Sequence, residues 1–359
     1  MPKLRRFVIV AFGLTLAGLA APGMAAAGEP PRIDKPKPVP PTIPPDVPPL
    51  PPAQIDPTLA VGGQDVKAKK VETRLSVDVQ VNGRGPYRFI VDSGADTSVV
   101  GIGIARDLQL PLGTPAILNG MTSRDQVDRV KVDELTLGPT SVHNLLLPAL
   151  REYDVGGDGI IGIDALVSKR LLMDFEKRLI KVEDASVRYI PVPGEIVVTA
   201  RRQRGQLILT HIRAAGVPLD AVIDTGTEIT IGNLALRDLL IRGNRDKFIE
   251  VPVIGVTGVT KKLQVARIGE LQLGPITISD VPMAFADVPP FKLFGLADQP
   301  ALLLGTDLLE TFRRISLDFK ARKVRFQLRK CTPEGVTIST DPDNFSRLSS
   351  TGTQDVCGR

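Results

Sequence analysis

The stretch Phe89-Ile90-Val91-Asp92-Ser93-Gly94 decides the fold, because a second copy, Ala221-Val222-Ile223-Asp224-Thr225-Gly226, follows later in the chain. In both copies an apolar run typical of a buried strand ends at an aspartate, a hydroxyl residue and a glycine. A lone carboxylate in this position costs free energy in an ordinary core. The repetition therefore predicts two lobes that each bring one carboxylate to a shared site.

The repeat extends beyond these two stretches and keeps the same order in both halves. The further matching segments are 105–108 with 236–239, 134–139 with 270–275, 160–164 with 303–307, and 173–175 with 317–319. Similarity maintained over such a length indicates a duplicated domain. Short helices are expected at the first pair of segments and after the glycines of the third pair.

Each half is predicted to be a small, mainly β domain. Residues 75–81 alternate apolar and polar, Asn82-Gly83 is typical of a hairpin turn, and the strand that ends at Asp92 follows. Aromatic residues make up only 4% of the chain and tryptophan is absent, so the core is aliphatic, which favours strands. The expected lobes are 71–190 and 205–330, with an inter-lobe linker at 191–204 and a C-terminal tail at 331–359.

Residues 1–27 are predicted to be an export signal. A basic start with Lys3, Arg5 and Arg6 precedes an apolar run, and small residues at 25–27 offer a cleavage site. A periplasmic or secreted protein with no membrane span in the mature chain is therefore expected. The alternative is an uncleaved signal that anchors the protein in the inner membrane.

Residues 28–70 are predicted to be a proline-rich, disordered linker. The prolines are densest between residues 38 and 52, where the chain cannot build strand ladders. An extended, semi-rigid spacer is expected there. A pro-segment that confers latency is the alternative.

Together, the two Asp-[Ser/Thr]-Gly loops and the later hydrophobic-hydrophobic-Gly segments at 160–162 and 303–305 resemble aspartic proteases. The similarity covers roughly residues 72–330 and is nearest to bacterial retropepsin-like proteases with two repeats in one chain. It implies a bilobal architecture of two retropepsin-like β-barrel lobes with a few short helices. It also implies that Asp92 and Asp224 are catalytic and that the hydrophobic-hydrophobic-Gly segments pack beneath the catalytic loops.

The chemistry of paired carboxyl groups supports this assignment. Two carboxylates about 3 Å apart cannot both ionise near neutral pH, so the pair holds one proton. The ionised member deprotonates a water that attacks a peptide carbonyl, and the protonated member donates to the carbonyl oxygen. Gly94 and Gly226 permit the tight turns. The resemblance implies that the Ser93 and Thr225 hydroxyls tie the two loops together.

The residue after the glycine differs between the copies: Ala95 in the first and Thr227 in the second. A hydroxyl at this position is able to hydrogen-bond the neighbouring carboxylate and favour its ionised form. The hypothesis is a pH optimum between acidic and neutral.

In the family, hairpin flaps close over the substrate. Candidate flaps are residues 117–130, with Gly120 and Met121 at the tip, and residues 253–266, with Gly255 and Gly258. Glycines at a tip suit a mobile lid. Neither hairpin contains tyrosine, unlike the flap of pepsin-type enzymes.

Other functional classes lack support in the sequence. The net charge of +5 is spread out, with no basic and aromatic cluster for nucleic acid. His143 and His211 are the only histidines, so no metal and no cofactor are expected. The GxGxxG pattern at 157–162 belongs to the repeat and is not expected to bind a nucleotide.

Two further segments leave alternatives open. Cys331 and Cys357 either close a disulfide or stay free. Residues 195–202 resemble the short segment by which outer-membrane receptors engage the energy-coupling protein TonB, and an extended segment of this kind is able to add a strand to a partner's sheet. A plain inter-lobe strand is the favoured interpretation.

The predicted function is that of an exported aspartic endopeptidase acting on extended polypeptides. Both aspartates lie in one chain, so a monomer suffices for the active site. The alternatives are a periplasmic module of the same fold that binds peptides without cutting them, and a dimer whose lobes pair between chains.

Overall fold

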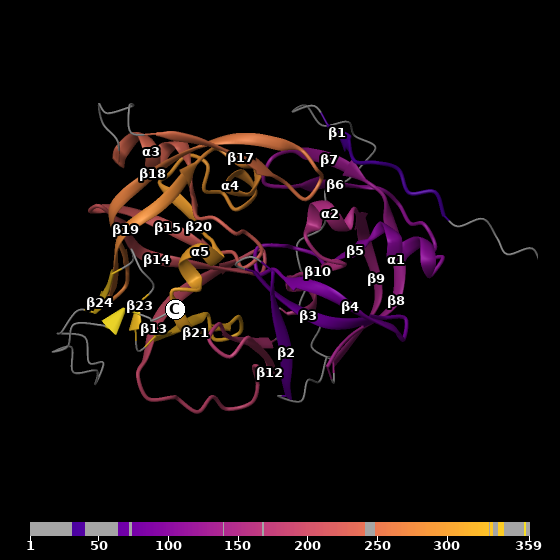
Figure 1. Cartoon of the computed structure of the whole chain (residues 1–359), viewed down its shortest axis with the longest axis horizontal. Helices are drawn as coiled ribbons and strands as arrows, with labels where there is room; N and C mark the ends of the chain where they lie inside the picture. The colour runs from indigo at the N-terminus through magenta and orange to yellow at the C-terminus, as the bar shows by residue number, and fades with distance from the viewer. Residues whose placement is uncertain are drawn as a thin grey trace, which may run out of the picture. The chain divides into compact units, whose positions relative to one another are not determined.

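The computed structural model describes residues 31–39, 64–71, 74–138, 140–166, 169–240, 248–329, 331–332, 337–340 and 355–356. The described part of the chain is mainly β and contains two closed barrels of six strands each. In Figure 1 the indigo-to-magenta strands build the first barrel and the orange strands build the second. The predicted bilobal, retropepsin-like architecture is confirmed.

The first barrel closes when its last strand pairs with its first. In order of hydrogen-bonded neighbours its strands are β3 (Arg74–Val81), β4 (Arg84–Val91), β10 (Gly159–Ile161), β5 (Val99–Gly101), β9 (Thr140–Leu150) and β8 (Arg129–Leu137). Val77, Val79 and Val81 alternate with less buried residues along β3 and lie in the core. As predicted, Asn82 and Gly83 turn β3 into β4, with φ of 49° and 71°. The turn residues and the alternation together fix this hairpin.

The second barrel repeats the first. Its strands, in the matching order, are β14 (Gln206–Ala214), β15 (Val217–Ile223), β20 (Ala301–Leu304), β16 (Ile231–Gly232), β19 (Ile276–Phe285) and β18 (Thr260–Leu273). In both barrels the strand that ends at the aspartate runs parallel to the strand of the hydrophobic-hydrophobic-Gly segment. The duplication seen in the sequence is therefore a duplication of topology.

A third group of strands joins the lobes. Its order is β2 (Gln64–Val71), β12 (Leu179–Asp184), β11 (Lys169–Asp174), β21 (Phe312–Asp318), β22 (Lys323–Leu328) and β13 (Glu195–Gln203). Asp174 and Asp318, from the repeated segments 173–175 and 317–319, are the last residues of its two central strands, β11 and β21. Arg314 donates to Asp174, and Arg170 donates to the buried Asp318 at 3.1 Å, so each aspartate pairs with an arginine of the other half.

Part of the segment predicted to be a disordered linker is ordered. Strand β2 begins at Gln64, so ordered structure starts before residue 71, within the segment predicted to be a disordered linker. Residues 31–39 also lie against the first lobe, with a short strand β1 (Lys37–Pro38), whereas residues 40–63 are outside the described residues.

Strand β13 covers the TonB-like segment and pairs with β22 and β14, as an inter-lobe strand does. Partner binding through it stays a prediction.

The helices are short. Helices α1 (Ile102–Asp107) and α3 (Leu234–Leu240) lie where the repeat predicted them. The turn η1 (Ile163–Ala165) and helix α5 (Thr306–Leu309) follow the two glycines, also as expected. Helices α2 (Glu152–Val155) and α4 (Pro289–Leu293) were not predicted. None of the helices in the described ranges is long and apolar enough to cross a membrane.

The described residues of the predicted C-terminal tail form three short strands. Strand β24 (Thr337–Thr340) pairs with β19 of the second barrel, and β23 (Cys331–Thr332) pairs with β25 (Asp355–Val356). Part of the tail therefore extends the second lobe. The side chains of the two cysteines and the predicted export signal at 1–27 lie outside what the structure describes.

Candidate active site

The two aspartates lie at equivalent places, directly after β4 and β15. The Asp92 N–H donates to the Ile161 carbonyl at 2.9 Å, and the Asp224 N–H donates to the Leu304 carbonyl at 3.1 Å. Each hydrophobic-hydrophobic-Gly segment therefore lies alongside the loop of its own lobe, as the resemblance implied. A parallel strand pair thus ends at each carboxylate, and a buried backbone positions it.

The glycines of these segments are required by the close approach of another backbone. A Cβ on Gly162 would lie 2.5 Å from the Thr97 carbonyl carbon, and a Cβ on Gly305 would lie 2.6 Å from the Ile229 carbonyl carbon. Real Cβ atoms do not approach backbone so closely, so any larger residue would move the loop. The glycine is therefore a condition for bringing the loop against its supporting strand.

The hydroxyl residues Ser93 and Thr225 cross between the lobes. The Ser93 N–H donates to the Thr225 hydroxyl at 2.9 Å, and the Thr225 N–H donates to the Ser93 hydroxyl at 3.2 Å. The hydroxyls in turn donate to main-chain carbonyls of the opposite lobe, Ser93 to Ile223 at 2.9 Å and Thr225 to Val91 at 2.8 Å. Both side chains are buried. This reciprocal set of four hydrogen bonds fixes the two loops relative to each other.

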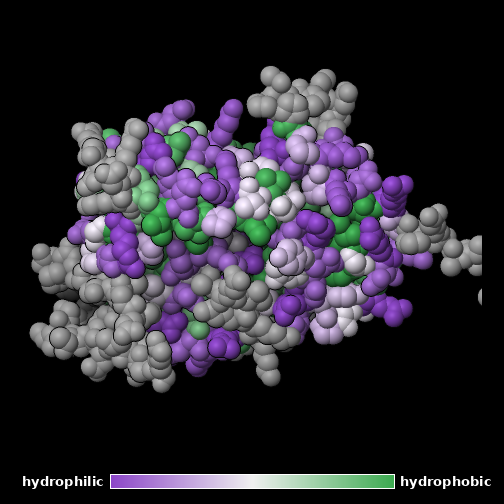
Figure 2. All heavy atoms as spheres, turned by 45° about the horizontal axis from the view of Figure 1, so that its top comes forward, coloured by the Kyte–Doolittle hydropathy of each residue, from purple (hydrophilic) through white to green (hydrophobic). Residues whose placement is uncertain are grey.

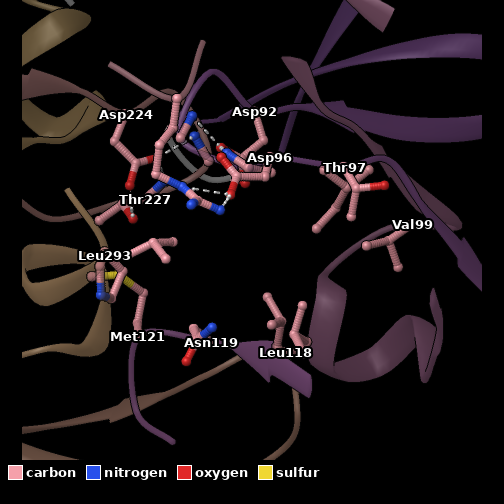
Figure 3. Close-up of a pocket in the computed structure, with 18 of the residues that line it drawn as sticks. Asp92, Asp96, Thr97, Val99, Leu118, Asn119, Met121, Asp224, Thr227 and Leu293 are labelled. Atoms are coloured by element: carbon pink, nitrogen blue, oxygen red, sulfur yellow. Dashed lines mark hydrogen bonds and ion pairs between the residues drawn. The ribbon is translucent and has the colours of Figure 1, made fainter. Parts of the chain in front are cut away.

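The two carboxyl groups converge. A Cβ on Gly94 would lie 2.5 Å from the Asp224 carboxyl carbon, and a Cβ on Gly226 would lie 2.1 Å from the Asp92 carboxyl carbon. Each carboxyl therefore occupies the space left free by the glycine of the other loop. The two carboxyl groups lie close enough for each to affect the pKa of the other. Figure 3 shows both aspartates facing the same cavity.

Each carboxylate accepts hydrogen bonds from its own loop. Asp92 Oδ1 accepts from the N–H groups of Gly94 and Ala95 at 2.8 and 2.9 Å. Asp224 Oδ1 accepts from the N–H groups of Gly226 and Thr227 at 3.0 and 3.1 Å. One oxygen of each group is thus held by the backbone N–H groups of its own loop.

The environment favours a proton on the pair. Burial raises the pKa of Asp92 to about 8, and the negative charge of Asp224 acts in the same direction. Burial also raises the pKa of Asp224, while the Thr227 hydroxyl and the loop N–H groups oppose this rise. Both carboxyl groups are therefore harder to ionise than an exposed aspartate.

The sequence difference after the glycine has a structural counterpart. The Thr227 hydroxyl donates to Asp224 Oδ2 at 2.9 Å, whereas Ala95 has no hydroxyl to offer Asp92. Because this hydrogen bond stabilises the ionised carboxylate, it lowers the pKa of Asp224. The two halves of the site are therefore electrostatically unequal.

Residues of two hairpins, at the places of the candidate flaps, line the cavity. The first flap consists of β6 (Ala116–Asn119) and β7 (Arg124–Val127), and the second of β17 (Ile249–Ile254) and the first part of β18. Gly120 and Met121 line the cavity, but Gly255 and Gly258 are absent from its lining. Figure 3 shows Leu118, Asn119 and Met121 on the side opposite the aspartates.

The flap tips cross to the opposite lobe. Met121 of the first flap packs against the apolar cluster of the second lobe, and Val256 of the second flap packs against the apolar cluster of the first lobe. The Ser123 and Thr257 hydroxyls are hydrogen-bonded at 2.7 Å. A Cβ on Gly255 would lie 2.1 Å from the Thr122 hydroxyl, so this glycine lets the tips meet. The flaps are closed in this structure.

Apolar residues form most of the remaining cavity wall. Those of the first lobe are aliphatic and include Val99, Leu150 and Ile160, while those of the second include Pro290, Leu293 and Phe294, from helix α4 and the residue after it. Figure 2, turned to bring the flap side forward, shows hydrophobic and hydrophilic residues interspersed over this face. An apolar cavity with two convergent carboxyl groups is the usual form of a small binding or catalytic site.

Two ion pairs beside the aspartate loops also join the lobes, and neither was predicted from the sequence. Arg204 donates to Asp96 at 2.7 Å, and the Arg74 Nε lies 2.8 Å from a Glu228 carboxylate oxygen. Asp96 and Glu228 occupy equivalent positions in the two loops. The arginines lie far from them in the chain, so no local sequence pattern predicts the pairing.

Two other acidic residues near the loops have structural roles. Asp164 accepts from the N–H and hydroxyl of Ser98, and Asp307 accepts from the N–H and hydroxyl of Thr230. Burial raises the pKa of Asp164, and it raises the pKa of Asp307 to about 6. Within the described residues, no group of three or more His, Cys, Asp or Glu side chains is arranged to hold a metal ion.

Two comparisons with known proteins gave different results, and the family comparison agrees with this geometry. A search of curated proteins found no match. A family model described as aspartyl protease matches residues 77–165 and 210–308, which together make up just over half of the chain. The two matched regions each contain one aspartate loop and its hydrophobic-hydrophobic-Gly segment. The chain therefore belongs to the aspartyl protease family.

Proposed function

We propose that this protein is an exported aspartic endopeptidase that hydrolyses extended polypeptides through a water activated by Asp92 and Asp224. The observation that carries the proposal is the convergence of the two carboxyl groups, each against the glycine of the other loop. The family match supports a protease, and the closed flaps over an apolar cavity suit a peptide held in extended form.

In the proposed mechanism the pair begins with one proton. The ionised member, favoured at Asp224 by the Thr227 hydroxyl, takes a proton from water as the oxygen attacks the peptide carbonyl carbon. The protonated member, favoured at Asp92, donates its proton to the carbonyl oxygen. The tetrahedral diol then loses the amine, which leaves with one proton from the pair, and a second proton returns from the diol. The pair ends with one proton and is ready for another substrate.

The proposal requires only one chain. Ser93 and Thr225 complete their reciprocal hydrogen bonds within the chain, and the ion pairs of Asp96 and Glu228 are also internal. These contacts within one chain support an active monomer. Mixing the Asp92→Asn and Asp224→Asn proteins tests this directly, because recovered activity would require lobes to pair between chains.

Cleavage of a library of internally quenched peptides across pH tests the function. We expect cleavage within peptides at apolar pairs, inhibition by pepstatin, and loss of cleavage in either Asp→Asn variant. Pepstatin binding by a wild-type protein that cleaves no peptide would favour the alternative of a peptide-binding module. The N-terminal sequence of the protein recovered from periplasm and medium tests export and signal removal.

A further inference from the structure

The most distinctive contact outside the catalytic loops is made by the residues that precede the lobes. Strand β1 pairs in antiparallel orientation with β7, the outer strand of the first flap, with Lys37 opposite Gln126 and Pro38 opposite Asp125. The flap hairpin thereby becomes a separate sheet of three strands in the order β1-β7-β6. Figure 1 shows β1 beside β7 and β6 at the top of the first lobe.

Three contacts fix this segment, residues 31–39, which we call the arm. Ile33 is only 5% exposed and belongs to the main apolar core. The Asp34 N–H donates to Asp128 Oδ2 at 2.7 Å. At the other end, the Val39 N–H donates to the Arg124 carbonyl at 3.0 Å. The arm is therefore attached to the body of the lobe and to the flap at once.

The attachment includes the base of the flap. Asp128 is the single residue between β7 and β8, where the flap leaves the barrel, and its carbonyl accepts from the Ala149 N–H at 3.0 Å. Flaps rotate about residues at the ends of secondary-structure elements, and Asp128 is such a residue. A segment that bonds Asp128, pairs with the flap strand and inserts Ile33 into the core resists this rotation.

The second flap is built differently. Its strand β18 runs without a break from the flap into the barrel and pairs with β19 there. In the described part of the chain, β17 pairs only with β18, and its Ile249 and Ile254 side chains are 64% and 54% exposed. The arm thus acts on the flap that has a break at its base.

We propose that the outer edge of β7 is a docking site for the arm, and that the docked arm holds the first flap closed over the cavity. The arm contains Lys35, Lys37 and Pro38, and lysine and proline are typical of edge strands that do not pair further. Strand β1 is therefore a suitable last strand for the flap sheet. Release of the arm allows the flap to open. The regulatory consequence rests on the proposed function, whereas the docking does not.

Hydrogen–deuterium exchange of the full chain tests the docking without any need for catalysis. The variants Ile33→Asp, which removes the core contact, and Val39→Pro, which removes the N–H donor to Arg124, are compared with wild type. We expect about tenfold faster exchange at the amides of β6 and β7, the change that corresponds to about 1.4 kcal/mol. Lys35→Ala, at an exposed position of the same arm, is the matched control and leaves exchange unchanged.

A peptide of residues 31–39 added to the Ile33→Asp protein provides a rescue, and the same peptide carrying Asp at position 33 is its control. We expect only the natural peptide to restore slow exchange in β7. Unchanged exchange in both arm variants would overturn the docking. Equal acceleration in both flaps would also overturn it, because it would indicate general destabilisation.

The association rate of pepstatin tests the regulatory consequence. Release of the arm in Val39→Pro is expected to speed association several-fold, since the flap opens more often. An unchanged rate beside faster flap exchange would contradict the control of access. If the wild-type protein neither cleaves peptides nor binds pepstatin, the proposed function fails, while the exchange comparison still decides the docking.

Discussion

The two halves of this chain have the same contacts that position the two aspartates. They differ in features that affect protonation of the aspartates and access to the cavity. Both barrels have the same strand order, the same glycine under a neighbouring backbone, and the same crossing hydroxyl and ion pair. They differ in the residue after the glycine of the aspartate loop and in the construction of the flap. The shared parts fix where two carboxyl groups meet, and this geometry tolerates little change. The differing parts affect protonation and access.

The largest effect is expected from removing one carboxylate. Asp92→Asn keeps the acceptor Oδ1 for the Gly94 and Ala95 N–H groups, so the loop stays folded. Without a second carboxyl the pair has no shared proton, and kcat/KM falls by about 10⁴-fold or more. The matching Asp224→Asn variant should lose as much, because the halves act as one unit. A variant that retains activity within tenfold of wild type would show that the halves are independent.

Alanine at the buried glycines tests whether the two supports are equivalent. Gly162→Ala and Gly305→Ala each force a Cβ to within 2.6 Å of a backbone carbonyl carbon, so we expect each to destabilise the fold by about 3 kcal/mol in denaturant titration. The control is Gly269→Ala in β18, where no heavy atom lies within 4 Å of the added Cβ and the change is below about 1 kcal/mol. A cost confined to one lobe would show that the supports differ.

Removal of the crossing hydroxyls should have smaller and equal costs. Ser93→Ala leaves the Ile223 carbonyl and Thr225 N–H without these partners, and Thr225→Val does the same to the Val91 carbonyl and Ser93 N–H. A cost of about 2 kcal/mol is expected for each, measured by chemical denaturation. A double mutant whose cost is the sum of the two single costs would argue against a reciprocal unit.

The smallest effect concerns the residue that differs. Thr227→Val removes a hydrogen bond to ionised Asp224, which raises the pKa of that carboxyl. The acidic limb of the kcat/KM profile should therefore move to higher pH, by about one unit. Ala95→Ser offers a donor to Asp92, whose pKa falls, so the alkaline limb should move to lower pH. Profiles that coincide with wild type would remove the hypothesis.

Much of the fold could be predicted because the sequence repeats. Asp92 and Asp224, their glycines and the flap hairpins are local patterns, and two copies of each made them visible. The ion pairs of Arg204 and Arg74 depend on contacts between distant segments and leave no periodic pattern.

The arm was missed for a different reason. A proline-rich segment indicates an extended spacer, and only tertiary contacts at Ile33 and Asp34 convert Lys37–Pro38 into a strand on the flap. Helices α2 and α4 have a single turn or little more, too short to give an apolar periodicity.

Carboxyl-carbon NMR titration of protein labelled at aspartate tests most directly whether one proton is held jointly by Asp92 and Asp224. Wild-type protein should show a resonance that titrates near pH 8 and disappears in Asp92→Asn, since burial and the facing charge of Asp224 keep the proton on Asp92 until the pH rises through that value. Resonances of both aspartates that titrate separately near the ordinary aspartate pKa, each unaffected by substitution of the other, would contradict a shared site.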